Sequence, residues 1–270
     1  MDIDNFLKNN LLAGRLCEGA QQIQGGQHPL WQGFVSTKDS EVEAYIKNCQ
    51  NPDALLVEII VALIGRVYGL PIPRPIVIKL EPDHPDIPLT KTTFIFGSEA
   101  KKCPNFSRFL REFNEREEMI LDYDKLHQII TFDELIANPD RNNNNILFDG
   151  GDFHFIDHEY CFNNKQNPKA EIMDQACKTG NISDIYKHYL GANDVQVHKF
   201  LNKVRAYVKD DIKATSNDAF AILKSVKTDD TSYHKKVEFV RSFILNRLPV
   251  LDVLVKNSIS INLNDDLLFC

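Results

Sequence analysis

The chain has 270 residues, of which 43% are hydrophobic and 26% are charged, which is the balance of an ordinary globular protein. Its formal net charge of −7 argues against a broad nucleic-acid-binding surface, so we expect no direct contact with nucleic acid, although a local basic patch stays open. The six cysteines have no C-x-x-C spacing, the N-terminus lacks a signal-peptide pattern, and no apolar run approaches roughly 18 residues. We therefore expect a cytoplasmic protein with no transmembrane segment, zinc site or disulfide framework.

The front of the chain is rich in predicted strands. Apolar and β-branched residues predict strands in four segments: 30–35, 42–47, 76–78 and 92–96. One helix interrupts them, because the apolar run 54–68 follows a start signal at residues 51–53 and ends at Gly69. Glu58 lies inside this apolar helix, where a charge is costly to bury unless it is paired.

The rest of the chain is predominantly helical. Apolar residues at helical spacing predict helices over 106–114, 123–137, 195–208, 212–227 and 233–256, the last with a kink or break at 246–249. This order predicts an α+β protein of two lobes with a cleft between them, where small ligands usually bind. The lobes expected are a small β-rich N-terminal lobe (residues 1–97) and a larger helical C-terminal lobe (residues 98–270).

The most informative motif begins at Asp140. Asn145 follows five residues later, and Asp157 comes after two short apolar runs, 146–148 and 153–156. The turn sequence Asp-Gly-Gly-Asp between the runs predicts a hairpin, which would bring the two ends of the motif near each other. An amide oxygen and a carboxylate suit Mg²⁺, and the earlier aspartate can orient or deprotonate a hydroxyl. This arrangement predicts a phosphotransferase that handles the γ-phosphate of a nucleotide.

Two other interpretations of the motif exist. Asn-rich loops between a helix and a strand are common, because Asn caps and turns well, and a D-x-x-x-x-N spacing alone often arises by chance. A transition-metal site made by His154, Asp157 and His158 is disfavoured, because residues 154 and 157 of a strand point to opposite faces.

With these pieces in order, the chain resembles the HipA-like atypical protein serine/threonine kinases, in their short single-domain form, over roughly residues 20–165. More distantly it is similar to phosphatidylinositol 3-/4-kinases, which share the D-R-x-x-x-N-I-L and I-D pattern. The phrases that carry the resemblance are Phe132-Asp133, Asp140-Arg141, Asn145-Ile146-Leu147, Ile156-Asp157-His158, Gly69-Leu70-Pro71-Ile72-Pro73 and Phe96-Gly97-Ser98-Glu99. The resemblance implies a bilobal, protein-kinase-like fold, with the catalytic loop and the metal-binding hairpin at residues 138–158.

The resemblance also implies roles for five residues. Asp140 would be the catalytic aspartate that accepts or orients the substrate hydroxyl, and Asn145 and Asp157 would hold magnesium. Lys47 would neutralise the α- and β-phosphates, and Glu58 would pair with Lys47 and fix it. The plainer alternatives are a solvated lysine at a strand end and a glutamate at a domain edge.

Nucleotide-covering positions are implied at two places. A loop at Gly25, Gly26 and Gln27 would cover the phosphates through backbone N–H groups, although it lacks a G-x-G-x-x-G pattern and could be an ordinary turn. Gly14 or Gly19 could contribute instead.

The connector that meets the adenine base would include Phe96, Ser98 and Glu99. His158 and Glu159 follow Asp157 where common kinases have Phe-Gly, which fits the HipA-like group and removes the glycine that lets that loop flip.

The sequence thus predicts an ATP- and Mg²⁺-dependent phosphotransferase, with a protein serine/threonine kinase as the leading form. Two alternatives stay open: a small-molecule or phosphoinositide-like lipid kinase, and a nucleotide-binding pseudokinase that acts as an interaction module. The expected partners are ATP, a protein substrate and an antitoxin or regulatory protein.

Overall fold

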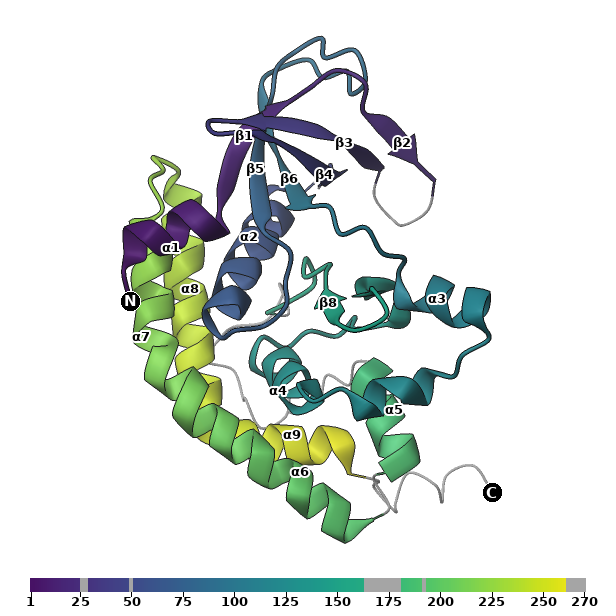
Figure 1. Cartoon of the computed structure of the whole chain (residues 1–270). Coiled ribbons are helices and arrows are strands. Elements are labelled where there is room, and N and C mark those ends of the chain that lie inside the picture. Colours follow the sequence, from purple (N-terminus) through teal and green to yellow (C-terminus); the bar gives the residue numbers. More distant parts are fainter. Residues whose placement is uncertain (25–28, 49–50, 163–180, 191–192, 261–270) are drawn as a thin grey trace. The chain divides into compact units, whose positions relative to one another are not determined.

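Figure 1 shows the computed structural model of the chain, which describes residues 1–24, 29–48, 51–162, 181–190 and 193–260. The chain forms two compact units. The first unit comprises Met1–Cys103, Asp149–Glu159 and Asp218–Val237, and the second comprises Pro104–Phe148, Tyr160–Asn217 and Glu238–Cys270. Strands dominate the front of the chain and helices dominate its rear, so the predicted mixture of a strand-rich part and a helical part is confirmed.

A six-stranded sheet forms the centre of the first unit. Its strands are β1 (Leu12–Leu16), β2 (Gln21–Ile23), β3 (Leu30–Thr37), β4 (Glu41–Lys47), β5 (Pro75–Leu80) and β6 (Thr93–Glu99). They are ordered β1-β5-β6-β4-β3-β2, and β1 pairs with β3 as well as with β5, so the sheet curls back on itself. Gly14 permits the approach of β1 to β3, because a Cβ at this position would lie 2.4 Å from the carbonyl oxygen of Ser36.

The four predicted strands correspond to β3, β4, β5 and β6. Alternation along β4 buries Ala44 and Ile46 in the core of the sheet, together with Val35 of β3 and Ile76 of β5. The same alternation puts Lys47, the last residue of β4, on the opposite face from Ile46. The sheet therefore fixes the position from which the lysine side chain starts.

Helix α2 (Pro52–Val67) lies against β5 and β6 (Figure 1). It begins where the sequence predicts, because the side chain of Asn51 accepts a hydrogen bond of 3.0 Å from the N–H of Asp53. Gly69 follows the helix in the left-handed region, with φ of 76°. The helix is almost entirely buried and carries Glu58, which is 1% exposed, into the first unit.

The hairpin turn predicted before Asp157 is present between β7 (Ile146–Phe148) and β8 (Phe153–Phe155). The N–H of Asp149 donates to the carbonyl oxygen of Asp152 at 3.2 Å. The Asp149 carboxylate accepts from the N–H groups of Gly151 and Asp152 at 2.9 and 2.7 Å. This turn is the physical reason why the chain reverses within four residues.

Within the first unit, two further contacts tie distant segments to the sheet and to α2. The N–H of Phe155 in β8 donates to the carbonyl oxygen of Pro71 at 3.1 Å, which fixes the chain just before Asp157. Helix α1 (Ile3–Asn10), which the sequence analysis does not predict, contacts α2 through a hydrogen bond of 2.7 Å from Arg66 Nε to Asn10 Oδ1.

Helices make up most of the second unit. They are α3 (Phe106–Phe113), α4 (Leu126–Leu135), α5 (Asn181–Leu190), α6 (Asp194–Tyr207) and α9 (Leu251–Ile259), while α7 (Lys213–Ser225) and α8 (Thr231–Arg247) each belong partly to both units. Helix α4 packs against α6 and α9, and α5 packs against α9. Among the residues that the structure describes, no helix is both long and apolar enough to cross a membrane.

Two helix boundaries bear on the predicted pattern. The predicted break at 246–249 is confirmed, since a 3-10 turn at Leu248–Val250 separates α8 from α9. The predicted gap between the helices at 195–208 and 212–227 is wrong, because a π-helical turn at Val208–Ile212 joins α6 directly to α7.

Candidate functional site

Lys47 lies at the centre of a group of acidic side chains in the first unit. Its Nζ atom lies 2.8 Å from Asp157 Oδ1, 3.0 Å from Glu159 Oε1 and 3.4 Å from Glu58 Oε1. Both glutamates are buried, whereas the side chain of Asp157 is 31% exposed. We call these four residues the Lys47 cluster. The structure thus brings together three of the residues that the sequence analysis selects, and it adds Glu159.

The cluster keeps the lysine charged. Burial lowers the pKa of the Lys47 ammonium, but the charges of Glu58, Asp157 and Glu159 outweigh burial and raise this pKa above its ordinary value. The backbone of Lys47 is also fixed, because the residue pairs with Phe96 of β6. Lys47 is therefore a held positive charge, which is what binding of phosphate oxygens requires.

The chain after β8 takes an unusual conformation at Asp157. This residue has a φ of 62°, in the left-handed region that Asp tolerates better than most side chains. The N–H of His158 then donates to Glu58 Oε2 at 2.9 Å, and the ring Nδ1 of His158 lies 3.6 Å from the same oxygen. Glu58 thus contacts both Lys47 and the backbone next to Asp157. Residues held in such conformations concentrate at functional sites.

The loop that carries Asp140 belongs to the second unit. Asp140 Oδ1 accepts a hydrogen bond of 2.8 Å from Asn142, and Oδ2 accepts one of 3.0 Å from Asn145 Nδ2. The N–H of Asp140 donates to Asn138 Oδ1 at 3.1 Å. Asp140 and Asn145 are therefore adjacent, and the half-buried Asp140 carboxylate is oriented by two amides while it keeps acceptor capacity for a hydroxyl.

Asp133 of α4 fixes this loop, a role that the sequence analysis does not assign. Arg141, 1% exposed, donates from Nε and Nη2 to the two Asp133 oxygens, both at 3.1 Å. Asn138 Nδ2 donates to Asp133 Oδ1 at 2.9 Å, and Arg141 Nη1 donates to the backbone oxygen of Asn145 at 3.0 Å. The available signal in the sequence is a carboxylate inside an apolar helix, which has to be paired if it is buried.

The residues expected to hold magnesium have suitable donor atoms. Asn145 uses its Nδ2 group to donate to the backbone and side-chain oxygens of Asp140, which leaves its amide oxygen as an acceptor. Asp157 contacts Lys47 through Oδ1, which leaves Oδ2 available within the described part of the chain. Oxygen atoms of these two kinds are ligands that Mg²⁺ prefers, so the residues fit this ion. Asn145 belongs to the second unit and Asp157 to the first.

The predicted phosphate-covering residues 25–27 lie outside the described residues. The structure describes the alternatives Gly14 and Gly19. Packing of the sheet explains the glycine at position 14, and the N–H of Gly19 already has a hydrogen-bond acceptor. Gly14 allows close packing of β1 on β3, and the N–H groups of Gly19 and Ala20 donate to Asp86 Oδ2 at 2.8 and 2.9 Å. Neither glycine therefore offers a free turn of backbone for phosphate.

Phe96, Ser98 and Glu99 lie within β6. Phe96 is buried and pairs with Lys47, while Glu99 makes a two-pronged ion pair with Arg74 at 2.9 and 2.8 Å. The hydrogen bond from Arg74 lowers the pKa of the Glu99 carboxyl. Glu99 is thus engaged in fixing the end of the sheet, and contact of these three residues with a nucleotide stays a prediction.

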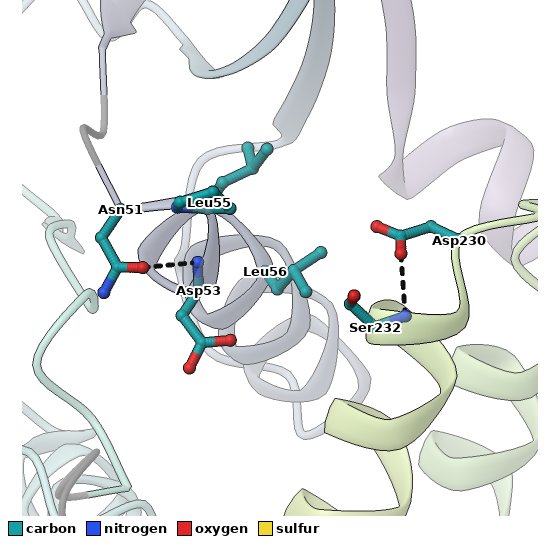
Figure 2. Close-up of a pocket in the computed structure, with 7 residues that line it drawn as sticks. Asn51, Asp53, Leu55, Leu56, Asp230 and Ser232 are labelled. Carbon is teal, nitrogen blue, oxygen red and sulfur yellow. Dashed lines mark hydrogen bonds between the residues drawn. The ribbon is translucent and has the colours of Figure 1, made fainter.

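A pocket of about 300 Å³ lies at the start of α2, also in the first unit. Figure 2 shows residues that line it: Asn51, Asp53, Leu55, Leu56, Asp230 and Ser232. Three of its polar side chains already have partners, since Asn51 caps α2, the Asp230 carboxylate accepts from the N–H of Ser232 at 2.8 Å, and Asp53 pairs with Lys236 at 2.8 Å. None of the residues predicted to bind nucleotide or metal lines this pocket.

Comparison with solved structures identifies the class of fold. The chain is similar to the proinflammatory kinase CtkA of Helicobacter pylori, with a TM-score of 0.55 and 11% sequence identity, over 91% of this chain and 96% of that one. It also matches the PAN3 pseudokinase of Neurospora crassa, with a TM-score of 0.41 and 9% identity, over 94% of this chain and 66% of that one. The first similarity shows that the fold is kinase-like.

The family follows from the sequence itself. A model of the HipA-like kinase family matches residues 24–208, which is more than half of the chain. The chain therefore belongs to the HipA-like kinase family, as the sequence analysis predicts. A search of curated protein sequences finds no match.

Proposed function

We propose that the protein is an ATP- and Mg²⁺-dependent phosphotransferase, specifically a protein serine/threonine kinase with a bilobal, protein-kinase-like fold. The observation that carries the proposal is the Lys47 cluster, in which an ammonium whose side chain is 12% exposed is held 2.8 Å from Asp157 and 3.4 Å from Glu58. A structural ion pair would need one carboxylate, whereas Lys47, at the end of a strand, contacts acidic side chains from a helix and from the segment after the hairpin. Membership of a kinase family supports the same conclusion.

Each residue has a task in such a reaction. Asp140 orients the acceptor hydroxyl and accepts its proton, while Asn142 and Asn145 hold the Asp140 carboxylate in place. Lys47 neutralises charge on the nucleotide phosphates, and Glu58 keeps Lys47 in position. A magnesium ion bound by Asn145 and Asp157 would supply further neutralisation of phosphate charge. Positioning and charge stabilisation of this kind lower barriers by on the order of 8 kcal/mol or more.

The remaining parts of the proposal rest on the family and on composition. We propose a protein as the acceptor, an antitoxin or regulatory protein as a partner, and the cytoplasm as the location. Contact with nucleic acid is not part of the proposal, given the net charge of −7.

The proposal is tested by incubating the purified protein with γ-labelled ATP and Mg²⁺, together with Asp140→Ala and Asp157→Ala. We expect label transfer to the protein itself or to an added protein substrate. In each variant the rate of this transfer should fall at least about a hundredfold. Because Asp157 is partly exposed and Asp140 lies in a loop, both variants are expected to keep the wild-type melting temperature within a few degrees. Asp122→Ala, at an exposed position of the second unit, is the matched control and should transfer label normally.

The same experiment separates the alternatives. Transfer to phosphoinositide or to a small alcohol, with none to protein, would replace the protein kinase by the lipid or small-molecule kinase. Thermal stabilisation by ATP without transfer to any acceptor would favour a pseudokinase. Full activity of Asp157→Ala would contradict the magnesium assignment.

A further inference from the structure

Three carboxylates surround the Lys47 ammonium, which donates hydrogen bonds to Asp157 and Glu58 and forms an ion pair with Glu159. An ammonium has three donors, and Nζ of Lys47 has three acidic neighbours, at 2.8, 3.0 and 3.4 Å. A phosphate oxygen that contacts this lysine therefore competes with these carboxylates for the ammonium. The question is therefore which carboxylates stay with Lys47 and which one leaves.

Burial distinguishes the three neighbours. Glu58 and Glu159 have side chains that are 1% and 5% exposed, whereas that of Asp157 is 31% exposed. A buried carboxylate without its counter-charge carries a large desolvation penalty, while an exposed one can be taken over by water or by a cation. Asp157 is therefore the neighbour that Lys47 can release.

The two buried glutamates are not equivalent. Glu58 divides its oxygens, since Oε2 accepts from the N–H of His158 at 2.9 Å and Oε1 lies 3.4 Å from Lys47. Glu159 Oε1 is nearer to Lys47, at 3.0 Å. Glu58 thus serves both Lys47, from which it accepts a hydrogen bond, and the backbone after Asp157, whereas Glu159 makes the shorter buried ion pair with the lysine.

We infer that Glu159 is a positioning residue that holds Lys47 in place for the phosphates of the nucleotide. This inference rests on the proposed function and assigns to Glu159 a task that the sequence analysis gave to Glu58 alone. Without Glu159, the ammonium keeps its short contact with Asp157, and it competes there with any cation that the carboxylate binds. The loss should therefore appear in the binding of phosphates and not in the binding of the base.

The test compares Glu159→Gln with the control Glu81→Gln. Glu81 also lies close to a lysine, 2.7 Å from Lys79, but at an exposed site. Calorimetry measures the dissociation constants of ATP with Mg²⁺ and of adenosine. We expect Glu159→Gln to raise the dissociation constant of ATP about tenfold, which is about 1.4 kcal/mol. The dissociation constant of adenosine should change less than twofold. Glu81→Gln should change neither constant. Equal weakening of both ligands, or no change in either, would overturn the inference.

A second background separates positioning from general damage to the fold. If Glu159 acts through the lysine, Glu159→Gln should not weaken the binding of ATP further in a Lys47→Met protein, in which no ammonium is left to hold. A further tenfold loss in this background would overturn the inference. A wild-type protein that binds ATP no better than adenosine would instead contradict the proposed function itself, so the two failures are distinguishable.

Discussion

At the scale of single residues, two buried side chains determine the shape of the loop at residues 138–145. Arg141 reaches back to Asp133 with two nitrogens at 3.1 Å and forward to the backbone of Asn145 at 3.0 Å. Asn138 contacts the same carboxylate at 2.9 Å and also receives the N–H of Asp140. The orientation of Asp140 therefore depends on Asp133, a buried residue of α4 that contacts both side chains.

We predict that Asp133→Ala destabilises the protein by about 3–5 kcal/mol, because it leaves the buried charge of Arg141 without its carboxylate. Urea unfolding at neutral pH measures the change. The double variant Asp133→Leu with Arg141→Leu removes both charges and should recover part of the loss, while phosphotransfer should stay low because the loop has lost its support. A single variant with wild-type stability would show that Arg141 is adequately held by its other contacts.

At the scale of elements, the well-predicted pieces are those with local signals. Helix α2 has a cap at Asn51 and a left-handed Gly69, and the hairpin turn is closed by Asp149. By contrast, β1 is short and pairs with β5 some sixty residues away, with Leu12 opposite Ile76, and no local pattern reports such a pairing. The π-helical turn Val208–Ile212 was missed because its charged residues, typical of a surface loop, lie on a continuous helix.

In the candidate site, too, the contacts between residues close in sequence could be predicted and the others could not. Asp140 and Asn145 are five residues apart in one loop, so their neighbourhood could be predicted from spacing. The contact of Glu159 with Lys47 could not be predicted, because no local pattern in the sequence reports the left-handed φ of 62° at Asp157, two residues before Glu159.

Helix α2 offers a test at this scale, since it positions Glu58. We predict that Asn51→Ala destabilises the protein by about 1 kcal/mol, because the N–H of Asp53 loses its acceptor at 3.0 Å. Asn51→Asp, which keeps a capping oxygen, should retain wild-type stability within about 0.5 kcal/mol. Urea midpoints with unchanged slopes would establish this ranking, and equal midpoints for both variants would show that the cap contributes nothing.

At the scale of the whole molecule, the free energy of unfolding should depend on pH through one buried carboxyl group. Glu134 of α4 and Arg247 of α8, both in the second unit, are each 1% exposed, and their nearest charged atoms are 3.5 Å apart, the limit of a hydrogen bond. Burial raises the pKa of the Glu134 carboxyl from 4.5 to about 8, because Arg247 offsets only part of the desolvation. Glu134 is therefore mostly protonated in the folded protein at neutral pH.

The sign of the effect follows from the two states. Between pH 4.5 and about pH 8 the folded protein binds a proton that the unfolded chain has released, so the contribution of Glu134 to stability falls as the pH rises. The free energy of unfolding changes with a limiting slope of about 1.4 kcal/mol per pH unit. This slope vanishes above the pKa of Glu134 in the folded protein. Glu134→Gln removes this proton, so the free energy of unfolding of the wild type should fall relative to that of the variant from pH 5 to pH 8.

Urea unfolding of both proteins at pH 5, 6.5, 8 and 9 measures this difference. We expect the two stability curves to diverge up to about pH 8 and to run parallel beyond it, since the wild-type carboxyl is then ionised in both states. Parallel curves from pH 5 onward would instead mean that Glu134 is already ionised in the fold. In that case the contact with Arg247 would be a true buried ion pair, and Glu134→Gln should be destabilising at every pH because it removes the carboxylate 3.5 Å from a buried guanidinium.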